Sequence, residues 1–153
     1  MRIKKAEKKE LKEIAKLMLE EFSKPPFNEK AKINSILKSL KFYYKIGKIY
    51  IALINNIIIS VIVFKLEQYW EGKVLIIEDL AVKQEFKGKG VGESLLNFVE
   101  SYAKNNNVKR ILFTTNKKSK SINFYRKRGY KEEKNRINFS KKVNKNGTSK
   151  RIF

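Results

Sequence analysis

The segment 77–92 constrains the fold of this chain more than any other part of the sequence. Residues 77–82 form a mainly apolar run with β-branched side chains, which is typical of a strand, and glycines follow at positions 88, 90 and 92. An apolar pattern with helical spacing then begins at Val91. A strand, a glycine-rich loop and a helix in this order predict an α/β unit.

The glycine-rich loop predicts a site for an anion. Backbone N–H groups of such a loop converge, the helix N-terminus adds positive potential, and glycine lets a phosphate approach the backbone closely. Two phosphate motifs are excluded, because Gly88-Lys89-Gly90 lacks the hydroxyl residue of a P-loop and residue 93 is Glu where the dinucleotide fingerprint needs glycine. A glycine-rich connector without a ligand is the alternative.

Periodicity predicts the elements on both sides of this unit. Apolar residues three and four apart predict helices over about 7–22, 33–44, 91–102 and 119–128, and Pro25-Pro26 ends the first of them. Apolar, β-branched-rich runs predict strands over 49–54, 57–66 and 73–82, with Asn55-Asn56 as a hairpin turn between the first two. Further short strands are expected over 2–4, 110–115, 130–133 and 136–143, and Gly129 is the expected helix C-cap. The order β-α-α-β-β-β-α-β-α-β(-β) predicts an α/β fold with a mixed central β-sheet flanked by helices.

These elements predict one domain over residues 1–143, without an interdomain linker or a repeat. Residues 144–153 are polar, basic and aperiodic, and we predict a flexible C-terminal tail there. The longest apolar stretch, 57–64, is far shorter than the roughly 20 residues that a membrane span needs. No signal peptide is recognisable, so we expect a cytoplasmic protein without a membrane partner.

Cysteine and histidine are both absent from the 153 residues. Their absence excludes disulfides, thiol nucleophiles, Ser-His-Asp triads and metal sites built from thiolate or imidazole. We therefore expect no metal site. Any proton transfer must use carboxylates, tyrosine, lysine or water.

The net charge of +21 is unevenly distributed along the chain. Residues 1–65 carry a net +9, residues 66–103 a net −3 and residues 104–153 a net +15. A nucleic-acid-binding protein is expected to present one basic face, and lysine, which dominates here, lacks the bidentate fork by which arginine reads bases. The charge pattern therefore argues against a nucleic-acid partner, and the acidic middle segment suits a cationic one.

Two motifs resemble those of a known family. The first is Lys87-x-x-Gly90-x-Gly92, which opens a helix after a strand ending in Leu80-Ala81-Val82. The second runs from Asn116 to Tyr130 as Asn-x-x-Ser-x-Ser-x-x-Phe-Tyr-x-x-x-Gly-Tyr. Together with the order of elements, they resemble the GCN5-related N-acetyltransferases over about residues 1–143. Lys87 stands where Gln or Arg is usual in that family, and Ser119 where Asn is usual.

The resemblance implies acetyl-CoA as cosubstrate. Its pantetheine arm would lie like an added strand beside the strand that ends at Val82, and the backbone N–H groups of the loop would hold the pyrophosphate. The residues implied to bind it are Leu80, Ala81, Val82, Lys87, Gly88, Lys89, Gly90, Val91, Gly92, Asn116, Ser119 and Phe124. Basic residues around 117–128 are candidates for the adenosine 3′-phosphate.

The resemblance also implies two catalytic residues. Tyr125 would lie near the sulfur and protonate the leaving thiolate as general acid. The run 77–82 is similar to the di- and polyamine acetyltransferase branch, which implies that Glu78, acting through water, takes the proton of the attacking amine. Because neighbouring strand residues face opposite sides, Asp79 is expected to serve acceptor electrostatics or structure, unless a bulge changes the alternation. The alternative for both carboxylates is an ion-paired strand end.

The acceptor is predicted to be a small cationic amine: a polyamine, a diamine, an amino-acid side-chain amine or an aminoglycoside. The resemblance assigns its site to the first helix–loop–helix and to the turn before the Glu78 strand. Carboxylates mixed with aromatic residues there suit a cation by ion pairing and cation–π contact. These residues are Glu20, Glu21, Phe22, Pro25, Pro26, Phe27, Asn28, Tyr69, Trp70 and Glu71. Residues 22–28 can equally form a plain helix-ending loop with a hydrophobic plug.

Two other functions are also compatible with the sequence. Tyr43, Tyr44 and Tyr69 keep acetylation of a protein N-terminus or lysine open. The basic C-terminal third keeps open a nucleic-acid- or ribosome-associated module, although few of its aromatic residues would form a stacking platform. A homodimer is compatible with the sequence.

Overall fold

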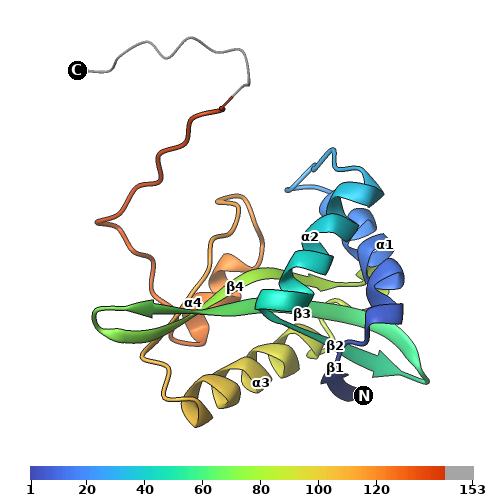
Figure 1. Ribbon diagram of the computed structural model, residues 1–153, viewed down its shortest axis with the longest axis horizontal. Coiled ribbons are helices and arrows are strands. Elements are labelled where there is room, and N and C mark those ends of the chain that lie inside the picture. Colours follow the sequence, from blue (N-terminus) through green and yellow to red (C-terminus); the bar gives the residue numbers. More distant parts are fainter. Residues whose placement is uncertain (144–153) are drawn as a thin grey trace. The chain divides into compact units, whose positions relative to one another are not determined.

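A five-stranded sheet organises the first of two structural units. A computed structural model describes residues 1–143, and the chain divides into Met1–Ser119 and Lys120–Phe153. The strands are β1 (Arg2–Lys5), β2 (Lys48–Ile54), β3 (Ile57–Tyr69), β4 (Gly72–Val82) and β5 (Arg110–Leu112), in the order β1-β2-β3-β4-β5 (Figure 1). Neighbours are antiparallel except for the parallel pair β4–β5. The predicted mixed central sheet is confirmed.

Helices cover both faces of this sheet (Figure 1). The helices α1 (Leu11–Phe22) and α2 (Ile33–Ile46) lie over one face, and α3 (Val91–Asn105) lies over the other. Short 3₁₀ helices, η1 (Lys8–Glu10) and η2 (Gln84–Phe86), precede α1 and follow β4. Under α1 and α2 the core contains fully buried side chains such as Ile14, Ile51 and Val63. On the α3 face, the ring of Phe64 packs between those of Tyr50 and Tyr102.

The turn between β2 and β3 follows directly from the sequence. Asn55 and Asn56 both have positive φ, +50° and +61°. A two-residue hairpin loop that matches the strand twist requires this conformation, and asparagine adopts it more readily than other residues with a side chain. The predicted hairpin is confirmed.

The second unit contains one helix among its described residues, α4 (Ile122–Lys127). Gly129 follows it at φ +86°, which confirms the predicted glycine stop. The strands predicted over 130–133 and 136–143 are not formed, and all side chains from 131 to 143 are exposed. Apolar residues such as Ile137 and Phe139 are compatible with a strand, but a strand also needs a hydrogen-bonding neighbour, which the local sequence does not supply. The tail predicted at 144–153 lies outside the described residues.

The helices within residues 1–143 are all too short or too polar to cross a membrane. The longest of them, α3, has 15 residues.

Candidate active site

A β-bulge places two carboxylates next to each other on one face of the sheet. Val63 of β3 pairs with Asp79, and the following residue, Phe64, pairs with Ile77, so Glu78 is an extra residue of β4. Val63 packs in the core under α1 and α2, whereas Phe64 contacts α3 on the opposite face. Because paired residues share a face, Asp79 lies on the α1–α2 side.

Glu78 lies on this same face. Its Oε1 atom is 3.2 Å from the Nζ atom of Lys65. Lys65 is two residues after Val63 in β3, so the two side chains lie on the same face of the sheet. Burial, followed by the charge of Glu78 and a hydrogen bond with it, raises the pKa of the Tyr43 hydroxyl on α2. The expectation that Glu78 and Asp79 face opposite sides is therefore wrong, because the bulge changes the alternation.

The two carboxylates differ in their surroundings. Burial raises the pKa of Asp79 from 3.8 to about 6, and the negative charge of Glu78 adds to this shift. Glu78 instead has the ammonium group of Lys65 beside it. The pair therefore contains a carboxyl group that changes protonation just below neutral pH, next to one that is ion-paired.

Beyond this pair, β4 has an open edge on its β5 side. The two strands pair over Val74–Ile76 of β4, so among the strands of residues 1–119 the outer edge has no partner over residues 77–82. An open edge presents N–H and C=O groups to which an extended amide chain can hydrogen-bond. Leu80, Ala81 and Val82, predicted to accompany the pantetheine arm, lie along this edge.

The glycine-rich loop lies between β4 and α3. Gly88 and Gly90 have φ of +71° and +79°, and Gly90 is the residue directly before α3. A Cβ atom built on either glycine would meet no heavy atom within 4 Å, so the space beside them is open within residues 1–143. The first turn of α3, which begins with Val91 and Gly92, has N–H groups that no intrahelical carbonyl can reach. This geometry leaves room for the predicted anion, whose binding stays a prediction.

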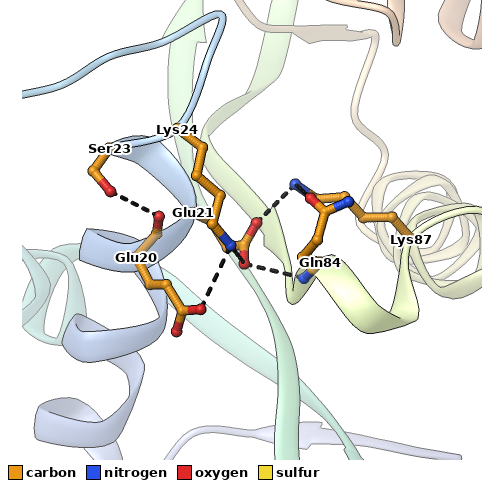
Figure 2. A network of polar contacts seen from close by, with 6 residues as sticks. All are labelled: Glu20, Glu21, Ser23, Lys24, Gln84 and Lys87. Carbon is orange, nitrogen blue, oxygen red and sulfur yellow. Dashed lines mark hydrogen bonds and ion pairs between the residues drawn. The ribbon is translucent and has the colours of Figure 1, made fainter.

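The loop is joined to the end of α1 by a network of polar contacts, shown in Figure 2. Glu21 is 4% exposed, and its Oε1 atom accepts hydrogen bonds from the Gln84 backbone N–H at 3.0 Å and the Lys24 ammonium at 2.9 Å. Its Oε2 atom lies 2.7 Å from Lys87 Nζ. The expectation that Glu21 attracts the acceptor is therefore not supported, since the protein's own cations surround this carboxylate.

Asn116 follows β5 and contacts the loop after α1. Its side-chain amide donates to the Pro26 carbonyl oxygen at 3.2 Å and accepts from the Lys118 N–H at 2.8 Å. Ser119 donates its N–H to the Asn116 carbonyl at 2.9 Å. Both residues implied to touch the pantetheine arm thus lie in one short turn after β5.

Phe124 and Tyr125 lie on α4, in the second unit. Their rings are 5.5 Å apart, and the Tyr125 ring also contacts that of Tyr130, with a centroid distance of 6.2 Å. Burial raises the pKa of the Tyr125 hydroxyl. This group therefore keeps its proton at neutral pH, as a general acid must.

The segments predicted on the acceptor side do not all come together. Phe22 and Phe27 form an edge-to-face pair with ring centroids 5.6 Å apart, which fits the predicted hydrophobic plug. Trp70 is fully exposed in the turn between β3 and β4, and Glu71 binds Arg110 at 2.6 Å. This turn lies about 20 Å along β4 from Glu78 at the usual strand rise, so it does not adjoin the carboxylate pair.

Sequence reasoning missed two partners of the carboxylate pair. The sequence predicts only that Lys65 belongs to a strand. A single lysine near the end of a β-branched run is, however, a signal that its face of the sheet holds a polar contact. Tyr43 was considered for peptide binding but not as a neighbour of Glu78. No pattern in the sequence pairs α2 with the end of β4, since their contact depends on how the helix packs.

No group of three or more Asp or Glu residues with the spacing of a metal site occurs in the described part of the chain.

Comparisons with known proteins identify the family and the fold of the chain. A model of the acetyltransferase (GNAT) family matches residues 11–130. No curated protein sequence matches the chain. A possible acetyltransferase from Clostridium difficile 630 has a similar structure, with a TM-score of 0.83 and 17% identity, over 94% of this chain and 98% of that one.

Two further solved structures share the fold. An aminoglycoside 6′-N-acetyltransferase from Acinetobacter haemolyticus has a TM-score of 0.77 and 19% identity, over 94% of this chain and 100% of that one. A protein from Clostridium acetobutylicum that is named as a predicted acetyltransferase, solved with acetyl-CoA, has a TM-score of 0.71 and 19% identity, over 91% of this chain and 95% of that one. At such identities these structures support the fold alone.

A mixed sheet flanked by helices, with an open strand edge beside a glycine-rich loop, defines an α/β protein. The chain belongs to the acetyltransferase (GNAT) family, whose members are acyltransferases that use acetyl-CoA. The predicted family resemblance and fold class are confirmed.

Proposed function

We propose that this protein transfers the acetyl group of acetyl-CoA to a primary amine by direct attack of the amine on the thioester. The observation that carries the proposal is the carboxylate pair Glu78–Asp79, which lies at the point where β4 loses its outer neighbour. The pantetheine arm would run along Leu80–Val82, so its thioester would reach the sheet edge close to a group able to accept a proton. A cytoplasmic location remains a prediction of the sequence.

The cosubstrate site comprises the open edge and the loop. Backbone groups of residues 80–82 hold the pantetheine arm, and N–H groups of residues 87–92 hold the pyrophosphate. Asn116 and Ser119 contact the arm from the β5 side. Phe124 is assigned to the same cosubstrate by the family resemblance alone. The open space beside Gly88 and Gly90 supports this assignment, because a phosphate needs that room.

Glu78 acts as the base, through a water molecule, and Asp79 supplies negative potential for the cationic acceptor. An amine must lose a proton before its lone pair can attack the carbonyl carbon. Glu78 accepts that proton, and the freed lone pair forms a C–N bond to the carbonyl carbon. The nitrogen then releases its excess proton to water, and the tetrahedral intermediate breaks its C–S bond to expel the CoA thiolate. The position of Glu78 supports this role, since it lies beside the open edge of β4 and its side chain is 26% exposed, so water can reach it.

Tyr125 acts as the acid that protonates the departing thiolate. We expect Tyr125→Phe to lower kcat about tenfold and to leave the affinity for CoA unchanged, because a thiolate is stable enough to leave slowly without a proton. Steady-state kinetics with calorimetric titration of CoA measures both quantities. Tyr130→Phe is the control, since its ring contacts that of Tyr125 and no catalytic role is assigned to it. Equal kcat values for wild type and Tyr125→Phe would contradict the role.

The acceptor is a small cationic amine of the polyamine, diamine or aminoglycoside kind. Two neighbouring carboxylates favour a cation. Two proteins of similar fold are named as aminoglycoside acetyltransferases, which supports the same class of acceptor.

A thiol-release assay with acetyl-CoA and a panel of spermidine, putrescine, tobramycin and lysine-containing peptides tests the proposal. We expect turnover with at least one small amine, and a rise in the melting temperature with acetyl-CoA. Turnover of peptides alone would show that the acceptor is a protein and not a small amine. A steeply salt-dependent gel shift with RNA, without stabilisation by acetyl-CoA, would show that the protein is a nucleic-acid-binding module and not an acetyltransferase.

A further inference from the structure

The buried carboxylate of Glu21 connects α1 to the turn that precedes the glycine-rich loop (Figure 2). We infer that Glu21 is a positioning residue for the pyrophosphate of acetyl-CoA, and that Lys87 binds Glu21 instead of the phosphate. The inference rests on the proposed function, because it concerns the same cosubstrate site. It assigns a role to a residue that the family motif does not include.

The energetic cost of burying the Glu21 carboxylate is offset by its polar partners. Burial by itself would raise its pKa, but hydrogen bonds and charge from Lys87 and Lys24, with the Gln84 N–H, lower it below the ordinary value. The carboxylate is therefore ionised at neutral pH although its side chain is 4% exposed. A buried charge held by two cations and a backbone N–H fixes the chain segments that supply them.

The segment fixed in this way is η2, between β4 and the loop. Its first N–H, at Gln84, donates to Glu21, and Lys87, the residue after η2, closes the turn by donating its N–H to the Gln84 carbonyl at 3.2 Å. On the β4 side, Lys83 donates its N–H to the Ile59 carbonyl at 2.9 Å. The segment is thus held at both ends, and Gly88 follows immediately, so its position sets where the N–H groups of the loop point.

Lys87 occupies the first position of the loop motif, but its ammonium group points toward α1. It lies 2.7 Å from Glu21 Oε2 and 3.2 Å from the Gln84 side-chain oxygen. At 2.7 Å the contact with Oε2 is a close ion pair. Movement of Lys87 to a phosphate would leave Oε2 buried without its cation, which is costly.

The two roles of Lys87 predict opposite results for Glu21→Gln. If Lys87 is bound by Glu21 to shape the loop, loss of the carboxylate weakens CoA binding. If Lys87 binds the phosphate and Glu21 competes for it, loss of the carboxylate frees the lysine and strengthens CoA binding. Calorimetric titration of CoA into wild type, Glu21→Gln, Lys87→Gln and the double variant distinguishes them.

We expect each single variant to raise the Kd for CoA about tenfold, as for loss of one charged hydrogen-bonded contact. The double variant should bind like either single one, because both remove the same pair. Glu21→Gln should raise the KM for acetyl-CoA. Its kcat, and its KM for the best amine of the panel, should stay within about twofold of the wild-type values. A structural defect of the whole site would instead lower kcat.

Glu20→Gln is the matched control. Glu20 precedes Glu21 on α1 and also contacts Lys24, at 3.5 Å, but its side chain is 62% exposed, so we expect an unchanged Kd. Tighter or equal CoA binding by Glu21→Gln, or additive losses in the double variant, would overturn the inference. If Glu21→Gln fails to fold, Lys87→Gln decides, since its side chain is 45% exposed, and an unchanged Kd there overturns the inference. Wild type that does not bind CoA would refute the proposed function itself.

Discussion

Glu78→Gln is expected to lower kcat/KM for the amine at pH 7 by about 100-fold or more, the range measured for loss of a general base. Glutamine has nearly the same shape and can still hold a water molecule, but it cannot take the proton of the ammonium group. The rate should recover partly as the pH rises toward the pKa of the amine, because more acceptor then arrives without that proton. Steady-state rates between pH 6 and pH 10 measure this.

Glu67→Gln provides a matched control for this experiment. Lys65 lies 3.2 Å from both Glu67 and Glu78, so either substitution removes one carboxylate from the same ammonium group. Glu67 lies near the end of β3 that turns into β4. We expect its loss to change kcat/KM by no more than about twofold, as for an exposed ion pair. Equal losses in the two variants would mean that local charge, and not proton transfer, explains the effect.

Asp79→Asn is expected to stabilise the protein at pH 8 by on the order of 1 to 3 kcal/mol, since each pKa unit corresponds to 1.36 kcal/mol. Burial raises the folded-state pKa of Asp79 from 3.8 to about 6. Below the unfolded-state value both states hold the proton and the carboxyl group does not disfavour folding. As the pH rises to about 6, the unfolded chain loses its proton first, so the stability falls; above this pH the cost is complete. Asparagine carries no charge and avoids the cost.

Urea unfolding at pH 4 and pH 8 measures this difference. The two proteins should have similar stability at pH 4, and the variant should be more stable at pH 8. The same variant should lose activity toward a cationic amine, and wild-type kcat/KM should fall as the pH drops through about 6, because the negative potential of Asp79 disappears there. Equal stability of the two proteins at both values of pH would show that Asp79 is not a buried charge.

The bulge in β4 explains why the site was predictable in its residues but not in its geometry. Glu78 and Asp79 were recognised from the strand they belong to, yet simple alternation places them on opposite faces. One unpaired residue in the register between β3 and β4 brings both to the α1–α2 face. Register depends on the partner strand, and no feature of residues 77–82 by themselves indicates the extra residue.

Glu21 and Lys87 provide a second example. Both were noticed in the sequence, Glu21 for the acceptor and Lys87 for the pyrophosphate. They are 66 positions apart, and their 2.7 Å contact arises because the end of α1 packs beside η2. A charged residue near a helix end is usually solvated, so burial of Glu21 could not be inferred from composition.

The segment 77–92 by itself determined the strand, the glycine-rich loop and the helix that follows, because apolar periodicity and glycine position are local properties of a chain. It also determined, with the motif that follows β5, which family the chain belongs to. The tertiary structure decided which side chains near this segment meet: Glu78 with Lys65 and Tyr43, and Lys87 with Glu21. These contacts depend on strand register and helix packing, which arise between segments far apart in the sequence and which no local pattern records.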